Sequence, residues 1–209
     1  MLLSTAYLPP VQYFCKLLSS DAEVEQCESF VKQTYRNRCV IDSPQGALTL
    51  TVPVEKPSDN NRLIRDLRIS DHGNWRHQHW QALTSSYYNS PFFEYYQDDF
   101  RPFYEQRYDF LVDFNEALTQ KCIELIDISV TLHRTNSYTP KESKPIGEND
   151  DFRDLISPKH YFSEDHTFNP VPYYQVFADR HGFLTNLSIV DLLFNMGPES
   201  IFILQKSTK

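Results

Sequence analysis

The stretch that decides the start of the fold is LLSTAYLPPVQYFCKLL, residues 2–18. Residues 2–8 form an apolar run that predicts a short buried strand, which Pro9 and Pro10 end because proline cannot donate to a strand ladder. Pro10 also suits the first turn of a helix, where a missing N–H costs nothing. Over 11–18 the apolar side chains recur with the helical period. The chain is therefore predicted to begin with a strand–helix unit.

Outward from this unit, two alternating runs predict a β-hairpin. Residues 34–41 place Cys39 and Ile41 on one face, and residues 47–54 alternate in the same way. The sequence SPQG at 43–46 between them is typical of a turn. A third strand is predicted over 63–69.

The rest of the chain contains segments with the helical period and segments typical of strands. Helical spacing and capping residues predict helices, and short apolar runs predict strands. The predicted helices cover 75–88, 92–106, 109–126 and 189–196, the last ending at Gly197; the predicted strands cover 128–132, 173–177 and 201–204. Because strands and helices alternate only in part, we expect an α/β or α+β fold with a mixed sheet, a hairpin and flanking helices.

No linker or repeat divides the chain, so residues 1–209 are expected to form a single layered domain. The region 135–170 is rich in Pro, Ser, Asp and Lys, which predicts a long polar loop that is either mobile or folded over a site. Its His160 and His166 have no fixed ligand geometry, so neither a metal nor a cofactor is predicted. The oligomeric state stays open.

Composition excludes several classes of protein. The 20 Lys and Arg against 28 Asp and Glu give a net charge of −8, which argues against nonspecific nucleic-acid binding. No apolar stretch is long enough to predict membrane insertion, and the N-terminus lacks a basic leader, so a cytoplasmic protein is expected. The 5 glycines never cluster, which excludes a P-loop and a dinucleotide fingerprint. The 4 cysteines form no CxxC pair and are expected to be reduced and buried.

Three residues of the first hairpin run are candidates for binding an anion. On a strand, Arg36 and Arg38 would project from the same face and flank Asn37. Arginine is the preferred partner of carboxylate and phosphate, so the pair predicts an anionic ligand. The alternative is a solvated strand face paired with surface carboxylates.

The segment WRHQHW, residues 75–80, supplies a candidate catalytic group. His79 lies at the edge of the apolar helix stripe that contains Trp80 and Tyr87, where it could act as an acid or base. A core-edge histidine bonded to a backbone carbonyl is the alternative. Twelve aromatic residues lie between Tyr87 and Phe114; they could form a polar pocket for a sugar, but such a run mostly packs helices.

Taken together, these motifs resemble the WbqC-like protein family. The similar segments, in order, are YLPPVQYF at 7–14, YRNR at 35–38, LTVPVEK at 50–56, WRHQHW at 75–80, YYQ at 173–175 and LSIVDLLFN at 187–195. The matches extend over nearly the whole chain. Each motif alone is weak, whereas six in the right order are fairly specific.

The resemblance implies a role in O-antigen or other surface-polysaccharide biosynthesis, with aminoacyl, glycyl or acyl transfer to an activated sugar. We therefore expect a transferase for a small anionic or sugar-type ligand, in which Arg36 and Arg38 anchor the anion and His79 is the acid–base group. Asn37, Tyr87 and Gln175 would orient the ligand by hydrogen bonds. The alternative is a non-catalytic module of the same fold that binds a glycan or a protein.

Overall fold

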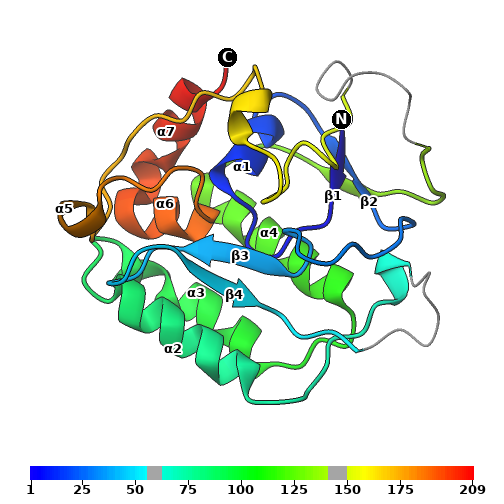
Figure 1. Cartoon of the computed structure of the whole chain (residues 1–209), viewed down its shortest axis with the longest axis horizontal. Coiled ribbons are helices and arrows are strands. Elements are labelled where there is room, and N and C mark those ends of the chain that lie inside the picture. The colour runs from blue at the N-terminus through cyan, green and yellow to red at the C-terminus, as the bar shows by residue number, and fades with distance from the viewer. Residues whose placement is uncertain (56–62, 141–149) are drawn as a thin grey trace.

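The computed structural model describes residues 1–55, 63–140 and 150–209. The N-terminal unit consists of β1 (Leu2–Ser4), α1 (Val11–Leu17) and β2 (Ala22–Glu25), with β1 and β2 parallel (Figure 1). The predicted strand–helix start is confirmed, although the strand ends earlier than expected. The chain leaves β1 after Ser4 and reaches Leu8 with a positive φ of 41°, which is incompatible with a strand.

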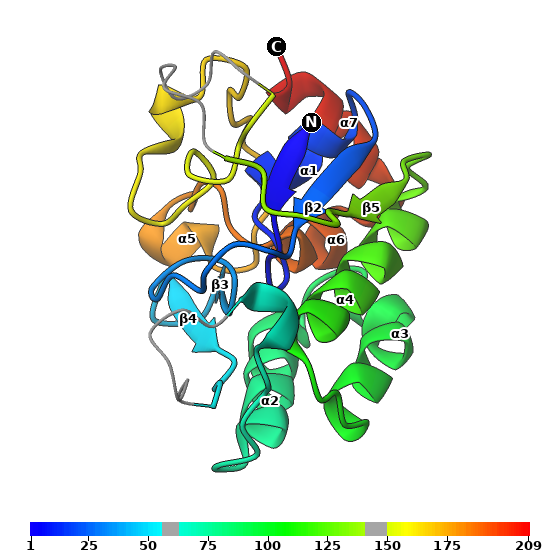
Figure 2. The same ribbon diagram turned by 90° about the vertical axis from the view of Figure 1, so that its right-hand side faces the viewer.

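The parallel sheet contains three strands in the order β1, β2, β5, and β5 (Leu132–Arg134) lies beside β2 (Figure 2). On the opposite edge of β1, a parallel bridge joins Leu2 to Asp151. The segment at Asp151, far along the sequence, therefore flanks β1 on one side, and β2 flanks it on the other. β2 was not predicted, and β5 begins where the predicted strand 128–132 ends.

The predicted hairpin is confirmed. Its strands β3 (Arg38–Ile41) and β4 (Leu48–Thr51) are antiparallel, with Arg38 opposite Thr51, and Cys39 and Ile41 face the core. The strand begins only at Arg38, so Arg36 lies outside it. The expectation that the two arginines share one strand face is therefore wrong.

Six helices complete the part of the chain that the structure describes: α2 (Trp75–Tyr87), α3 (Phe93–Glu105), α4 (Leu111–Ile126), α5 (Ala178–His181), α6 (Ile189–Met196) and α7 (Ser200–Ser207). Four of them, α2, α3, α4 and α6, match the predicted helices. Figure 1 shows α2 and α3 on one side of the hairpin and α1, α6 and α7 on the other. The aromatic run packs between helices as expected, with the rings of Tyr87, Phe93 and Phe100 about 5 Å from that of Phe194.

Three predicted strands are wrong. The segment 63–69 forms a single 3-10 turn at Ile64–Asp66, which buries Ile64 and Leu67 three residues apart. The segment 201–204 belongs to α7, whose buried positions 200, 203, 204 and 207 have the helical period. The segment 173–177 has no strand partner among the described residues. Instead, the Gln175 side chain donates to the carbonyl of Leu184 and accepts from the N–H of the same residue.

The described part of the polar loop is folded against the rest of the protein. Lys16 of α1 forms a buried ion pair with Asp165 at 2.5 Å, and the Nε2 of Gln12 donates to the same carboxylate. The residues 56–62, with the last residue of the LTVPVEK motif, and 141–149, with Gly147, lie outside the described residues. All four cysteines are buried and free, as expected. No described helix is long and apolar enough to cross a membrane.

Candidate functional site

A polar crevice lies at the carboxyl end of β1. In parallel sheets, ligands bind beyond the carboxyl ends of the strands, at the point where the strand order reverses. Here that point is β1, which has β2 on one side and the bridge to Asp151 on the other. The crevice encloses about 10 Å³, room for about one water molecule. It is lined by Leu3, Ser4, Thr5, Ala6, Tyr13, Tyr35, Arg36, Phe152, Arg153 and Ile156.

On one wall, Arg36 is held in a bidentate pair with Glu28. The Nε of Arg36 donates to Oε1 of Glu28 at 2.9 Å, and its Nη2 donates to Oε2 at 2.7 Å. The Nη2 also donates to Oγ of Ser4, which in turn donates to Glu28. Both charged side chains are at most 5 % exposed. Burial removes water from both charges, so each charge depends on its partner. Removing either partner leaves an uncompensated buried charge.

Arg153, which also lines the crevice, is fully buried among oxygen acceptors. Its Nη1 lies 3.2 Å from Oε2 of Glu25 and donates to the carbonyl of Thr139 at 2.8 Å. Its Nε and Nη2 donate to Asp151. This arginine comes from the polar loop, so the loop supplies part of the crevice wall, which agrees with the predicted alternative of a loop folded over a site.

Tyr13 is the polar side chain of the crevice that the protein leaves open. The side chain is only 3 % exposed, yet no described residue forms a hydrogen bond with its hydroxyl. Burial raises its pKa, so the hydroxyl stays protonated and can donate. Tyr13 lines the crevice, so a molecule bound there would be a hydrogen-bond partner for this hydroxyl.

His79 lies in the core rather than on the crevice wall. The hydroxyl of Tyr7 is 2.9 Å from its Nδ1 and 2.8 Å from the hydroxyl of Tyr104, so the three side chains form a hydrogen-bonded row. Burial lowers the pKa of His79 to about 4, so the imidazole is neutral at pH 7. Tyr7 is the residue after Ala6, and Ala6 lines the crevice, so this row begins next to the crevice in the chain.

Tyr87 and Gln175 meet at a different place, the buried carboxylate of Asp191 in α6. Tyr87 donates to Oδ1 of Asp191 at 2.8 Å, while Tyr173 and Gln175 donate to Oδ2 at 2.7 and 3.0 Å. Burial raises the pKa of Asp191 to about 6, against the opposing effect of these three donors. Ser188 caps the N-terminus of α6, because its Oγ accepts from the N–H of Val190.

A second carboxylate, Asp42, follows β3 close to this cluster. Its Oδ1 is 3.1 Å from Nε2 of His181, and its backbone N–H donates to the hydroxyl of Tyr87. Burial raises the pKa of Asp42, and the neighbouring His181 opposes that shift. The two carboxylates therefore form a buried acidic pair linked through one tyrosine.

Asn37 and Arg38 each keep an unpaired buried atom. The Nδ2 of Asn37 donates to the carbonyl of Val52, but its Oδ1 has no partner among the described residues. The Nε of Arg38 is likewise buried and unpaired in the described part of the chain. These atoms are available to a ligand, although neither residue lines the crevice.

Four of the six predicted residues thus fall into three places: Arg36 in the crevice, His79 in the tyrosine row, and Tyr87 with Gln175 at Asp191. Asn37 and Arg38 belong to none of them. Sequence reasoning missed Tyr13 and Arg153 in the crevice, and Glu28 as the partner of Arg36. Tyr13 falls inside the first motif, whereas nothing near Glu28 or Arg153 marks them. Across the described residues, no group of three or more His, Cys, Asp or Glu side chains is arranged to hold a metal ion.

The fold and the polar crevice describe a mixed α/β protein with a site at the end of its first strand. Comparison with protein families places the chain more closely: the model of the WbqC-like protein family matches residues 5–203, so the chain belongs to this family. It is also similar to the protein named "Uncharacterized protein Rv1507c" from Mycobacterium tuberculosis (strain ATCC 25618 / H37Rv), with 25% identity over 189 residues. That similarity covers 82% of this chain and 81% of the relative. No solved structure matches the chain.

Proposed function

We propose that this protein is a cytoplasmic transferase that moves an aminoacyl, glycyl or acyl group to an activated sugar in the biosynthesis of O-antigen or another surface polysaccharide. Family membership supports the biological setting, and the crevice at the end of β1 supports the chemistry. The observation that carries the proposal is that Tyr13, whose hydroxyl has no partner among the described residues, lines the same crevice as two buried arginines, Arg36 and Arg153.

An amino acid or an acyl phosphate is complementary to this crevice in charge and hydrogen bonding. Its carboxylate or phosphate oxygens would accept from Arg36 and from the hydroxyl of Tyr13, both of which line the crevice. The crevice must widen to admit such a ligand, because it now holds about one water molecule. Phe152 and Ile156 of the polar loop lie on the wall that would move.

The transfer step requires a nucleophile and a leaving group. The amine or hydroxyl of the sugar attacks the carbonyl carbon of an ester or acyl phosphate; a C–N or C–O bond forms and the bond to the leaving oxygen breaks. The nucleophile's proton needs an acceptor, and His79 is the predicted one. A neutral imidazole can accept a proton, and its Nδ1 is 2.9 Å from the hydroxyl of Tyr7, the residue that follows Ala6 of the crevice lining.

The proposal is tested by ligand-induced stabilisation and turnover with glycine, alanine, their acyl phosphates and nucleotide sugars as probes. Tyr13→Phe removes only the unpartnered hydroxyl, so it should fold normally yet lose most of the stabilisation by the ligand. Tyr88→Phe, at a tyrosine that is 75% exposed, is the matched control. Equal stabilisation of the parent and Tyr13→Phe would overturn the assignment of the site.

The same assay separates the transferase from the binding module. His79→Gln keeps a hydrogen-bonding side chain of similar size, so a catalytic role predicts retained ligand binding with lost turnover. Retained turnover would mean that His79 is not the acid–base group and only positions Tyr7. Ligand binding by the parent protein without turnover on any acyl donor and sugar would favour the non-catalytic module.

A further inference from the structure

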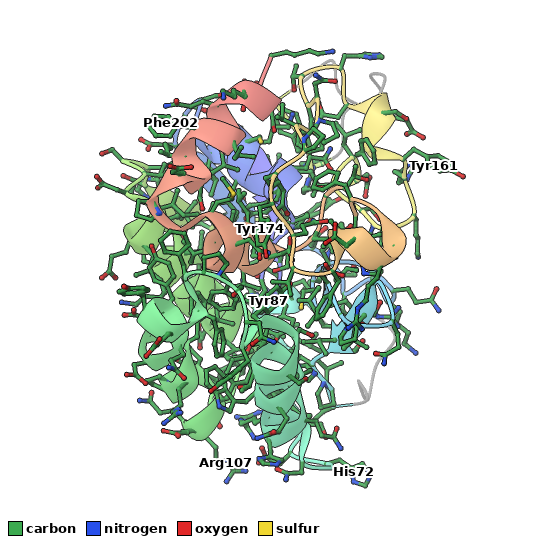
Figure 3. The ribbon with its side chains drawn as sticks, turned by 90° about the vertical axis from the view of Figure 1, so that its left-hand side faces the viewer. His72, Tyr87, Arg107, Tyr161, Tyr174 and Phe202 are labelled. Carbon is green, nitrogen blue, oxygen red and sulfur yellow. The ribbon has the colours of Figure 1, made fainter. Side chains whose placement is uncertain are left out.

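A second, larger hollow lies at the start of α2, away from the crevice. It encloses about 260 Å³, against about 10 Å³ for the crevice. Gly73, Asn74, Trp75, Arg76, His77, Trp80, Tyr104 and Glu105 line it. His72 and Arg107, labelled in Figure 3, lie at this end of the molecule, whereas Tyr87 marks the other end of α2. None of the crevice residues described above belongs to this lining.

One wall of the hollow is aromatic and rigid. The ring of Trp80 is half-buried and is held by Phe93 at 6.1 Å and Tyr104 at 5.8 Å, measured between ring centroids. Tyr104 is itself fixed by the hydrogen bond of its hydroxyl to Tyr7. A half-buried indole beside a buried tyrosine presents a flat apolar surface in a fixed orientation. The guanidinium of Arg101 lies over the same ring, 5.7 Å from its centroid.

The polar wall carries both signs of charge. Arg76 and His77 supply donors, and the carboxylate of Glu105 supplies acceptors. Arg76 is already paired with Asp71 at 2.9 Å, and Arg107 binds the same carboxylate. Arg101, over the Trp80 ring, adds a third guanidinium, while Asp71 and Glu105 are the carboxylates. Hydrogen-bond donors and acceptors therefore both surround the hollow.

A neutral ring with hydroxyl groups around its edge fits both walls. A pyranose has one face of C–H groups that can pack on an aromatic ring, and hydroxyls that both donate and accept hydrogen bonds. A purely apolar ligand would displace water from the carboxylate of Glu105 without giving it a hydrogen-bond donor. We infer that the hollow is a saccharide-binding site that takes a neutral pyranose against Trp80, with Arg76, His77 and Glu105 bonding its hydroxyls. The inference stands apart from the crevice proposal, because the two sites share no lining residue.

The chain supplies its own reporter for this inference. It contains 2 tryptophans, Trp75 and Trp80, and both line the hollow. Titration with methyl α-glucopyranoside, methyl β-galactopyranoside and N-acetylglucosamine is expected to change the tryptophan emission in a saturable way. Sorbitol, an acyclic polyol, and sodium phosphate serve as comparison probes that should give no saturable change.

Three variants make the test specific. Trp80→Leu should abolish binding, and Glu105→Gln should weaken it about tenfold by removing a charged hydrogen-bond acceptor. Glu94→Gln, also on α3, is the matched control and should bind like the parent. Binding by Trp80→Leu is measured by calorimetry, because this variant lacks one of the two fluorescent reporters. Glu105 is exposed, so Glu105→Gln provides a folded variant if Trp80→Leu fails to fold.

Several results would overturn the inference. They are no saturable change with any of the three pyranosides, a saturable change with phosphate instead, or parent-like binding by Glu105→Gln. Tyr13→Phe separates the two sites: it should leave the pyranoside response unchanged even if the crevice proposal is wrong.

Discussion

Replacing Arg36 by methionine is expected to expose how strongly the crevice depends on its ion pair. Three hydrogen bonds leave with the guanidinium: two to Glu28, at 2.9 and 2.7 Å, and one to Ser4 at 2.8 Å. Glu28 is 5 % exposed and would then be a buried carboxylate whose only donor, within the described ranges, is the Ser4 hydroxyl. Removing one partner of a buried pair costs about 3–5 kcal/mol.

The second arm of the experiment removes the other partner as well. Buried pairs are often replaced by apolar side chains without loss, so Arg36→Met/Glu28→Met is expected within about 2 kcal/mol of the parent. The two substitutions should therefore be strongly non-additive. Arg65 and Asp66 form the control pair: they are 46% and 60% exposed, and their coupling should stay below about 1 kcal/mol.

Urea unfolding at pH 7, followed by circular dichroism, measures the free energies of unfolding for the four proteins of each cycle. An unchanged m-value shows that the unfolded state is comparable across variants. If Arg36→Met costs less than about 1 kcal/mol, or if the effects of Arg36→Met and Glu28→Met simply add, the pair is not desolvated and the described crevice geometry is wrong.

Three further outcomes are expected. His79 has its pKa lowered from 6.5 to about 4, so its contribution is complete above pH 6.5 and is lost as the pH falls; the free energy of unfolding of the parent relative to His79→Gln should therefore fall by about 2 kcal/mol from pH 7 to pH 5, because the effect of Asp191 is common to both proteins. Asp191 has its pKa raised to about 6, so its contribution is present below pH 3.8 and is lost as the pH rises through 6; Asp191→Asn should remove that loss in urea titrations between pH 4 and 7. Gly197→Ala should lower the free energy of unfolding by about 1–3 kcal/mol, because a Cβ would lie 2.5 Å from the Phe92 ring at φ 54°, and Phe92→Leu in the same chain should restore part of it; no effect of Gly197→Ala would contradict the close approach.

The periodic elements were readable from the sequence because each carries its own signal. The strand–helix start, the hairpin and the helices α2, α3, α4 and α6 follow from local spacing. The segment 201–204 shows the limit: four apolar residues cannot distinguish a strand from a helix, and only the buried Ser200 and Ser207 reveal the helical period. β2 was missed because its sequence AEVE has little apolar character.

Tertiary pairing decides the site, so the sequence could supply its candidates but not their grouping. Arg36 was correctly singled out, yet its partner Glu28 comes from another segment and turns the guanidinium away from Arg38. Tyr87 and Gln175 meet on Asp191, 104 and 16 residues away along the chain. Tyr13 is conspicuous only once the structure shows that its hydroxyl has no partner among the described residues.

The position of a bound substrate would test the central claim most directly. Crystals of the protein soaked with an amino acid or an acyl phosphate should place a carboxylate or phosphate oxygen within hydrogen-bond distance of the Tyr13 hydroxyl, beside Arg36. The loop residues Phe152 and Ile156 should shift outward to make room. Ligand density at the Asp191 cluster or in the α2 hollow, with the crevice unchanged, would contradict the claim.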